Sequence, residues 1–262
     1  MSEVGSRRVG LVVRLVHYWW PVALGWSIAL VWNQVSARPA SHAGLAVLLW
    51  GIFGAYSLDR LLDGTPPADP AWLRAVLAVA FALSVAASLF YLVALPPGTI
   101  ALIPLLAAAG LFYRRLKRYP LTKTVLVPVV WVWAGLALPA ADGSWFGWRS
   151  VLLPVSAPLV ALFAAGCLLC DVKDADADSR TGVKSLPAVF GIPSTIAVAT
   201  ALAVAGALMA WLQQRTGLLV TGLALVGMGQ WTTVLTAGPA GALLVDLALT
   251  IPGFLIFTHL VR

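Results

Sequence analysis

Two short acidic stretches stand out in this sequence because the rest of the chain has almost no carboxylates. The first is Asp59-Arg60-Leu61-Leu62-Asp63, and the second runs from Asp171 to Asp178. Together they hold six of the ten Asp and Glu residues of the chain. Carboxylates beside a bilayer are costly and mark functional sites by default. The sequence therefore predicts that the chemistry of this protein takes place at these two stretches.

The carboxylates of each stretch are spaced to share one face of a helix. Residues three, four or seven apart are neighbours on a helix surface, and these spacings join Asp59 to Asp63, and Asp171 to Asp174 and Asp178. Clusters of like charge repel unless a cation bridges them. Oxygen ligands with room for water and phosphate oxygens are what Mg²⁺ prefers. We therefore interpret these five carboxylates as metal ligands that hold Mg²⁺ over a diphosphate.

A third polar element, between Tyr113 and Lys123, is basic. It contains five cations, namely Arg114, Arg115, Lys117, Arg118 and Lys123. Some of them anchor the chain at the cytoplasmic membrane surface, and Arg114 and Arg115 are expected to face lipid headgroups. Lys117 and Lys123 are predicted to bind the diphosphate as charge-assisted hydrogen-bond donors.

The elements that position these groups are membrane helices. The chain of 262 residues is 61% hydrophobic and 10% charged, with a mean hydropathy of +0.93. Soluble domains carry about 25% charged residues, and a backbone in lipid must satisfy its own hydrogen bonds within helices or a closed barrel. Apolar runs of roughly 17–25 residues suit helices. We predict an all-α integral membrane protein that forms one domain over residues 1–262.

The apolar runs predict about nine spans. These are 11–32, 42–58, 71–94, 99–116, 124–141, 150–170, 193–212, 217–235 and 241–260. With a cytoplasmic N-terminus, thirteen of the seventeen Lys and Arg residues lie on the cytoplasmic side, in agreement with the positive-inside rule. Both acidic stretches and the basic loop then fall on that side, which predicts a central cavity opening toward the cytoplasm.

The second acidic stretch and the residues after it resemble the second aspartate motif of the UbiA superfamily of intramembrane prenyltransferases. The resemblance is carried by Asp171-x-x-Asp174-x-x-x-Asp178-x-x-x-Gly182-x-Lys184-Ser185-Leu186-Pro187-x-x-x-Gly191. Asp59-x-x-x-Asp63 resembles the tail of the first motif of that family. The stretch Tyr113-x-x-x-Lys117, with Lys123 and Trp131, resembles its loop between helices four and five.

The resemblance implies Mg²⁺-dependent transfer of a prenyl group from a polyprenyl diphosphate to an aromatic or quinone-precursor acceptor. It implies an enzyme of the inner membrane, with lipids and no nucleic acid as partners. The catalytic residues implied are Asp59, Asp63, Asp174, Asp178 and Lys117, and the diphosphate-binding residues are Lys117, Lys123, Arg118 and Lys184. Aromatic faces stabilise cations, and those expected beside the allylic cation are Tyr113, Trp131 and Trp133.

One departure from the family leaves alternatives open. The first motif of the family usually begins with Asn four residues before its first Asp, where this chain has Ala55. Either Ser57 or water takes the place of that amide, or the donor is handled differently. The alternatives are phosphoribosyl transfer to a lipid phosphate, prenyl cyclisation, a prenyl-lipid binder without turnover, and a cation transporter.

Three further polar groups lie within the predicted spans. Cys167 and Cys170 are expected to be packing residues, because no second cysteine pair or histidine cluster accompanies them. Asp246 lies near the start of the last span. An intramembrane carboxylate is a functional candidate, but this shallow depth favours a structural role.

Overall fold

Every apolar run of the sequence overlaps a helix in the computed structural model. The structure describes residues 3–36, 40–63, 71–116, 119, 122–140, 149–236 and 239–258. This description leaves out the side chains of residues 3–15, 17, 18, 63, 114, 116, 123, 149–153, 181 and 239. No strand occurs in these ranges, so the all-helical prediction is confirmed for them.

The helices follow one another through short connections. In chain order they are α1 (Glu3–Ser36), α2 (His42–Asp63), α3 (Ala71–Leu92), α4 (Pro97–Ile100), α5 (Leu102–Leu116), α6 (Thr122–Ala140), α7 (Arg149–Asp171), the 3₁₀ turn η1 (Val172–Asp174), α8 (Ala175–Thr181), α9 (Leu186–Phe190), α10 (Ile192–Leu212), α11 (Thr216–Gly229), α12 (Thr232–Leu235) and α13 (Pro239–Phe257).

Five of the described helices are long and apolar enough to cross a membrane. They cover His42–Leu62, Ala71–Leu92, Pro154–Arg180, Ile192–Leu212 and Ala240–Phe257. Three shorter apolar helices cover Pro97–Tyr113, Thr124–Ala140 and Thr216–Gly229. The count of nine spans is therefore not confirmed. The predicted span 217–235 differs most, because α11 ends at Gly229 and a turn at Gln230 separates it from α12.

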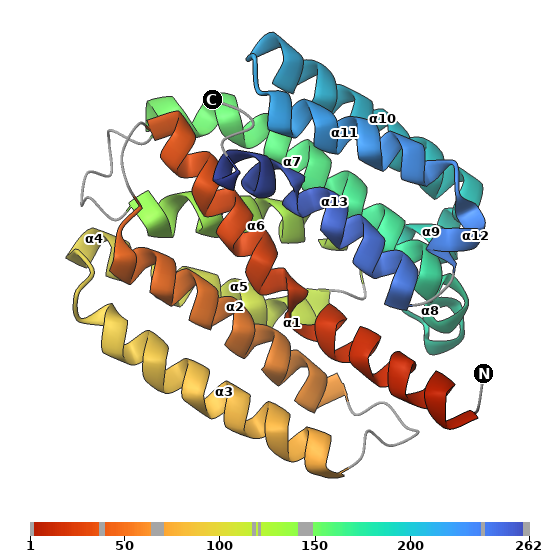
Figure 1. The fold of residues 1–262 in the computed structure, drawn as a ribbon, viewed down its shortest axis with the longest axis horizontal. Coiled ribbons are helices and arrows are strands. Elements are labelled where there is room, and N and C mark those ends of the chain that lie inside the picture. The colour runs from red at the N-terminus through yellow and green to blue at the C-terminus, as the bar shows by residue number, and fades with distance from the viewer. Residues whose placement is uncertain are drawn as a thin grey trace.

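Helix α7 lies in the middle of the bundle. Figure 1 shows α3 along one edge and α10 with α11 at the opposite edge, with α7 and α13 between them. In the most apolar window of the span that contains most of α7, 72% of the residues are buried, whereas the corresponding share for the span of α3 is 17%. Along α3, Leu83, Leu89 and Phe90 are exposed, as expected for a helix that faces lipid. The second acidic stretch is thus attached to the most enclosed helix of the five.

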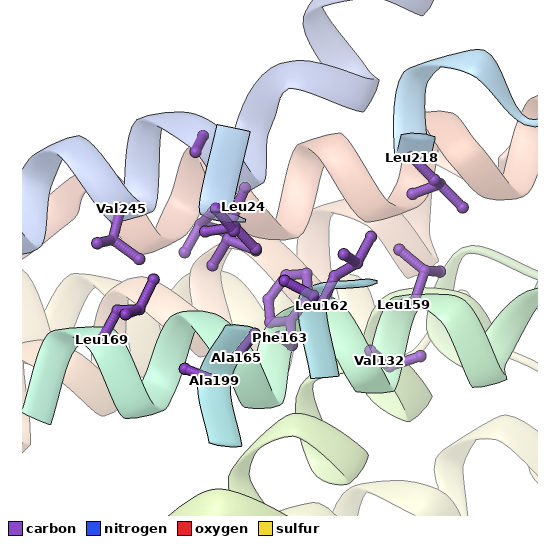
Figure 2. Close-up of a cluster of buried hydrophobic side chains, with 14 of the residues drawn as sticks. Leu24, Val132, Leu159, Leu162, Phe163, Ala165, Leu169, Ala199, Leu218 and Val245 are labelled. Atoms are coloured by element: carbon purple, nitrogen blue, oxygen red, sulfur yellow. The ribbon is translucent and has the colours of Figure 1, made fainter. Parts of the chain in front are cut away.

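The main core surrounds α7. Figure 2 shows Leu159, Leu162 and Phe163 of α7 among side chains from the neighbouring helices, and Val245 of α13 near Leu169. These side chains are at most 4% exposed. Because lipid tails are as apolar as leucine, such contacts hold a membrane protein together by close packing rather than by exclusion of water. The packing fixes the position of the C-terminal end of α7, where the acidic stretch begins.

Helices α1 and α13 cross at a point of close backbone approach. The Ser27 hydroxyl accepts a hydrogen bond from the Gly253 backbone N–H at 2.9 Å. A Cβ atom at position 253 would lie only 2.5 Å from the Cα atom of Ser27. Small residues permit this kind of contact between membrane helices. Position 253 therefore needs glycine for space, and the contact ties the first helix of the described chain to the last.

Replacing Gly253 with Leu is expected to destabilise the protein, because the new side chain overlaps the backbone of α1. Overpacking of this kind costs about 1–3 kcal/mol, which corresponds to a fall of about 2–12 °C in the unfolding midpoint of a chain of this size. The measurement is thermal unfolding in detergent. Gly227→Leu is the matched control, because no atom lies within 4 Å of a Cβ built at that glycine. Equal midpoints for the two variants would contradict this account of the crossing.

Candidate functional site

The first acidic stretch occupies the end of α2. Asp59 is half-buried and follows Tyr56 by three residues, so the two side chains share a face of the helix. Ser57 is buried, and its hydroxyl donates to the Phe53 carbonyl oxygen at 2.7 Å. Because Ser57 is 1% exposed and its proton is engaged inside α2, the structure does not favour Ser57 as the substitute for the amide that Ala55 lacks. The side chain of Asp63 lies outside the described residues.

The second acidic stretch is not one continuous α-helix. Helix α7 ends at Asp171, η1 forms a 3₁₀ turn that ends at Asp174, and α8 begins at Ala175. The turn changes the angle between successive side chains. Asp171 is 5% exposed, whereas the Asp174 side chain is 40% exposed. The simple helical spacing used for these carboxylates is therefore wrong in detail, because the backbone changes its winding between them.

A lysine is paired with the middle carboxylate of this stretch. Lys173 Nζ lies 2.5 Å from Asp174 Oδ2. Asp178, one turn into α8, is half-buried, and its Oδ2 atom is shielded from solvent. Asp176 in the same helix is exposed. The stretch thus offers carboxylates in three different settings, of which one is already in contact with a cation.

Glycine makes the reversal after α8 possible. Gly182 has a φ of 73°, a left-handed conformation that side chains disfavour. Its backbone N–H bonds to the Asp178 carbonyl oxygen, as does that of Val183 at 2.9 Å. This C-cap turns the chain so that α9 packs back against α8. Lys184 follows the turn and is exposed.

An aromatic and polar cluster lies one helical turn, about 5 Å, deeper than Asp59. Its centre is Tyr56, whose ring lies 6.1 Å from that of Trp131 in an edge-on arrangement. Trp131 in turn lies 6.2 Å from the Phe163 ring. Tyr113 and Asp59 are also close enough to Tyr56 to act on it electrostatically. The structure therefore brings predicted residues from α2, α5 and α6 together at one place.

Helices α7 and α13 complete this cluster. Cys167 and Asp246 both interact electrostatically with Tyr56. Cys170 Sγ lies 3.9 Å from the Ala242 carbonyl oxygen and 4.0 Å from Asp246 Oδ1. Both cysteines are free thiols. We call the set Tyr56, Tyr113, Trp131, Phe163, Cys167, Cys170 and Asp246 the central cluster.

Several predicted residues do not join the central cluster or cannot be placed. Trp133 is 36% exposed, because a residue two positions after Trp131 projects about 200° around the helix. Lys117 and Arg118 lie outside the described residues, and so do the side chains of Arg114 and Lys123. The predicted diphosphate clamp therefore remains a prediction.

Sequence reasoning did not single out Tyr56 or Phe163. A signal for Tyr56 was present, since it precedes Asp59 by three residues and so shares its helix face. Phe163 carried no comparable signal. Its place beside Trp131 depends on how α6 and α7 pack.

The described residues contain no group of three or more His, Cys, Asp or Glu side chains that holds the geometry of a metal site. Magnesium does not require such a cage. It keeps several water ligands and is bound through one or two carboxylates together with substrate phosphates. The donors at the ends of α2 and α7 are carboxylate oxygens, so their chemistry suits this ion.

A separate hollow lies at the opposite end of the bundle. It is lined by residues that include Val31, Gln34, Arg215 and Pro252. These positions are in the C-terminal parts of α1 and α13 and at the start of α11, away from the two acidic stretches. The hollow does not belong to the acidic site.

A family model described as the UbiA prenyltransferase family matches residues 70–251. The chain belongs to this family. The match begins after Asp59 and Asp63 and includes the whole second acidic stretch. As a UbiA family member with several apolar helices, the chain is a multi-pass membrane protein. A search of curated proteins finds no match to it.

Solved structures of other UbiA homologues share the fold. An apo UbiA homologue from Aeropyrum pernix K1 is 19% identical, with a TM-score of 0.73 over 92% of this chain and 98% of that chain. A homologue from Archaeoglobus fulgidus bound to DMAPP and Mg²⁺ is 16% identical, with a TM-score of 0.56 over 94% and 96%. The same homologue bound to GPP and Mg²⁺ gives 0.55 over 95% and 97%.

Proposed function

We propose that this protein transfers a prenyl group from a prenyl diphosphate to an aromatic acceptor inside the membrane, with Mg²⁺ as cofactor. The observation that carries the proposal is the arrangement of layers. Asp59 and Asp171 lie near the C-terminal ends of α2 and α7. Tyr56 lies about one turn deeper than Asp59, and Phe163 lies about two turns deeper than Asp171. Such layers suit a substrate with an anionic head and an apolar tail.

The acidic layer is the proposed site of the diphosphate. Asp59, Asp63, Asp171, Asp174 and Asp178 are the residues that would hold Mg²⁺. When bound, the ion neutralises negative charge on the leaving diphosphate. Lys117, Arg118, Lys123 and Lys184 are proposed as hydrogen-bond donors to the same group. Support comes from the fold shared with the Archaeoglobus fulgidus homologue, which binds DMAPP or GPP together with Mg²⁺.

The Lys173–Asp174 pair fits this assignment. When no metal ion is bound, a neighbouring ammonium group can balance the charge of a carboxylate that is proposed to bind Mg²⁺. Lys173 provides it at 2.5 Å. On substrate binding, the lysine is free to turn its ammonium group toward the diphosphate oxygens, since the side chain is long and partly exposed.

The central cluster is the proposed site of the allylic cation. Heterolysis of the bond between the prenyl carbon and oxygen leaves a delocalised cation, which aromatic faces stabilise. Tyr56, Trp131 and Phe163 supply such faces from three different helices. Phe163 is 4% exposed, and a site closed to water would protect the cation from capture by it. A carbon of an electron-rich acceptor ring then forms a bond to the prenyl cation, and the proton at that carbon passes to the released diphosphate.

The remaining parts of the proposal concern the membrane. We infer that residues 1–262 form one domain with about nine spans around a cavity open to the cytoplasm, in the inner membrane. Lipids are the surrounding partners, and the acceptor is an aromatic or quinone-precursor molecule. The excess of Lys and Arg on the side of the acidic stretches supports this orientation.

Diphosphate release tests the proposal directly. Purified protein in detergent is given radiolabelled geranyl, farnesyl or geranylgeranyl diphosphate, with phenolic acceptors and with Mg²⁺ or a chelator. We expect release and prenylation that depend on Mg²⁺ and are lost on chelation. No release from any donor by folded protein would contradict prenyl transfer. Release without an acceptor product would instead indicate cyclisation or hydrolysis.

A further inference from the structure

Asp246 is an ionisable residue that the proposed transfer does not yet use. It lies in the apolar span Ala240–Phe257, whose mean hydropathy is 2.0. Its neighbour Val245 is fully buried in the core, whereas Asp246 is half-buried. A carboxylate inside a membrane span is expensive and faces the protein interior or a polar space. The sequence alone favoured a structural role for it.

The contacts of Asp246 place it beside the central cluster. Its Oδ1 atom lies 4.0 Å from Cys170 Sγ, and Cys170 precedes Asp171 directly. The carboxylate also interacts electrostatically with Tyr56, which lies one turn deeper than Asp59. Asp246 therefore lies at the boundary between the acidic layer and the aromatic layer. In the proposed reaction, this boundary is where the prenyl carbon loses its diphosphate.

The chemistry of a carboxylate limits what it can bind there. The diphosphate is an anion and would be repelled by Asp246, and the prenyl chain has no hydrogen-bond donor. Among the stable organic reactants, the acceptor is the one that can donate a hydrogen bond to this carboxylate. An acceptor that carries a hydroxyl group can donate to a carboxylate oxygen, and hydrogen bonds to charged groups are stronger than neutral ones.

We propose that Asp246 is the acceptor-binding residue and accepts a hydrogen bond from a hydroxyl group on the acceptor ring. This inference rests on the proposed prenyl transfer and deepens it. The hydrogen bond holds the ring against Tyr56 and Trp131, with a ring carbon turned to the prenyl cation. A site built to bind a hydroxyl group rejects an analogue that lacks the donor. Asp246 thus selects hydroxylated aromatic acceptors over their ethers.

The test separates use of the donor from use of the acceptor. The wild type and Asp246→Asn are first compared for the rate of diphosphate release without acceptor. They are then compared for kcat/KM of transfer to a panel of phenols and naphthols and to the O-methyl ethers of the same compounds. The reference pair is 1-naphthol and 1-methoxynaphthalene. We expect the variant to keep release within about threefold of the wild type. Transfer to the hydroxylated acceptor should fall about 10-fold, and the preference over the ether should shrink by a similar factor, because the Asn amide oxygen accepts a weaker hydrogen bond than a carboxylate does.

Two further variants guard against a purely structural effect. Asp246→Glu keeps the carboxylate and should recover part of the lost transfer. Thr250→Val removes a hydroxyl one turn further along α13, where it donates to the Leu247 carbonyl oxygen of its own helix, and should leave both activities unchanged.

Two sets of outcomes would overturn the assignment. The first set would overturn the assignment of Asp246 alone. It consists of an unchanged preference of Asp246→Asn for the hydroxylated acceptor over the ether, an equal loss of release and transfer in that variant, and a wild type that releases diphosphate but prenylates no hydroxylated acceptor. The second set has one outcome, a wild type that releases no diphosphate, and this outcome would overturn the proposed function as well. Because release is measured separately, failure of the assignment and failure of the function are distinguishable.

Discussion

Replacing Asp178 with Asn is expected to lower Mg²⁺-dependent diphosphate release by about 100- to 1000-fold. The substitution keeps the size of the side chain and removes its charge. In the structure, Asp178 is half-buried and one of its oxygens is shielded from solvent, so bulk water cannot replace the lost carboxylate easily. The measurement is the rate of release from a labelled prenyl diphosphate at saturating Mg²⁺.

Asp176→Asn is the matched control for this experiment. Asp176 lies in the same helix, α8, and its substitution removes the same charge. Its side chain, however, is exposed. We expect its release rate to stay within about threefold of the wild type, because an exposed charge is screened by water and salt. Similar losses in the two variants would show that the acidic stretch acts by its net charge, and would refute the specific role given to Asp178.

Replacing Trp131 with Leu is expected to lower prenyl transfer by about 30-fold. The reason is the loss of an aromatic face beside the cation, where a desolvated cation–π contact contributes about 2 kcal/mol. Trp131 lies between the rings of Tyr56 and Phe163, so its removal also opens the cluster to water. The products should therefore include more prenyl alcohol, measured by chromatography of the labelled prenyl chain.

Trp133→Leu provides the comparison on the same helix. Trp133 is 36% exposed and does not belong to the central cluster. We expect its rate and its ratio of alcohol to transfer product to match the wild type within about threefold. If Trp133→Leu were the more damaging change, the assignment of the cation site to the inner face of α6 would be wrong.

The composition of the sequence was enough to predict a helical membrane protein, while the placement of its chemistry at the two acidic stretches stays a prediction. These predictions depend on local physics. The backbone of an apolar run in lipid must form its hydrogen bonds within the run, so the run forms a helix. A carboxylate at the end of such a helix indicates a candidate functional site. The family resemblance rested on the same residues, and the family match over residues 70–251 confirms it.

The details that the sequence did not predict depend on contacts between helices. The 3₁₀ turn between Asp171 and Asp174 is not visible in a count of residues, because a change of winding depends on the neighbours of the turn. Trp131 and Trp133 look equivalent in the sequence, and only the packing of α6 shows which one is inward. The place of Asp246 beside Tyr56 joins residues that are far apart in the chain.

The crossing of α1 and α13 bears on how the protein is made. Ser27 and Gly253 form a direct contact between helices at opposite ends of the described chain. Membrane proteins are synthesised from the N-terminus, so α1 is made before α13 and lacks this contact until α13 has been synthesised. Asp246 arrives with α13 as well. The bundle is therefore closed and Asp246 is brought to the central cluster by the same late event, the insertion of α13.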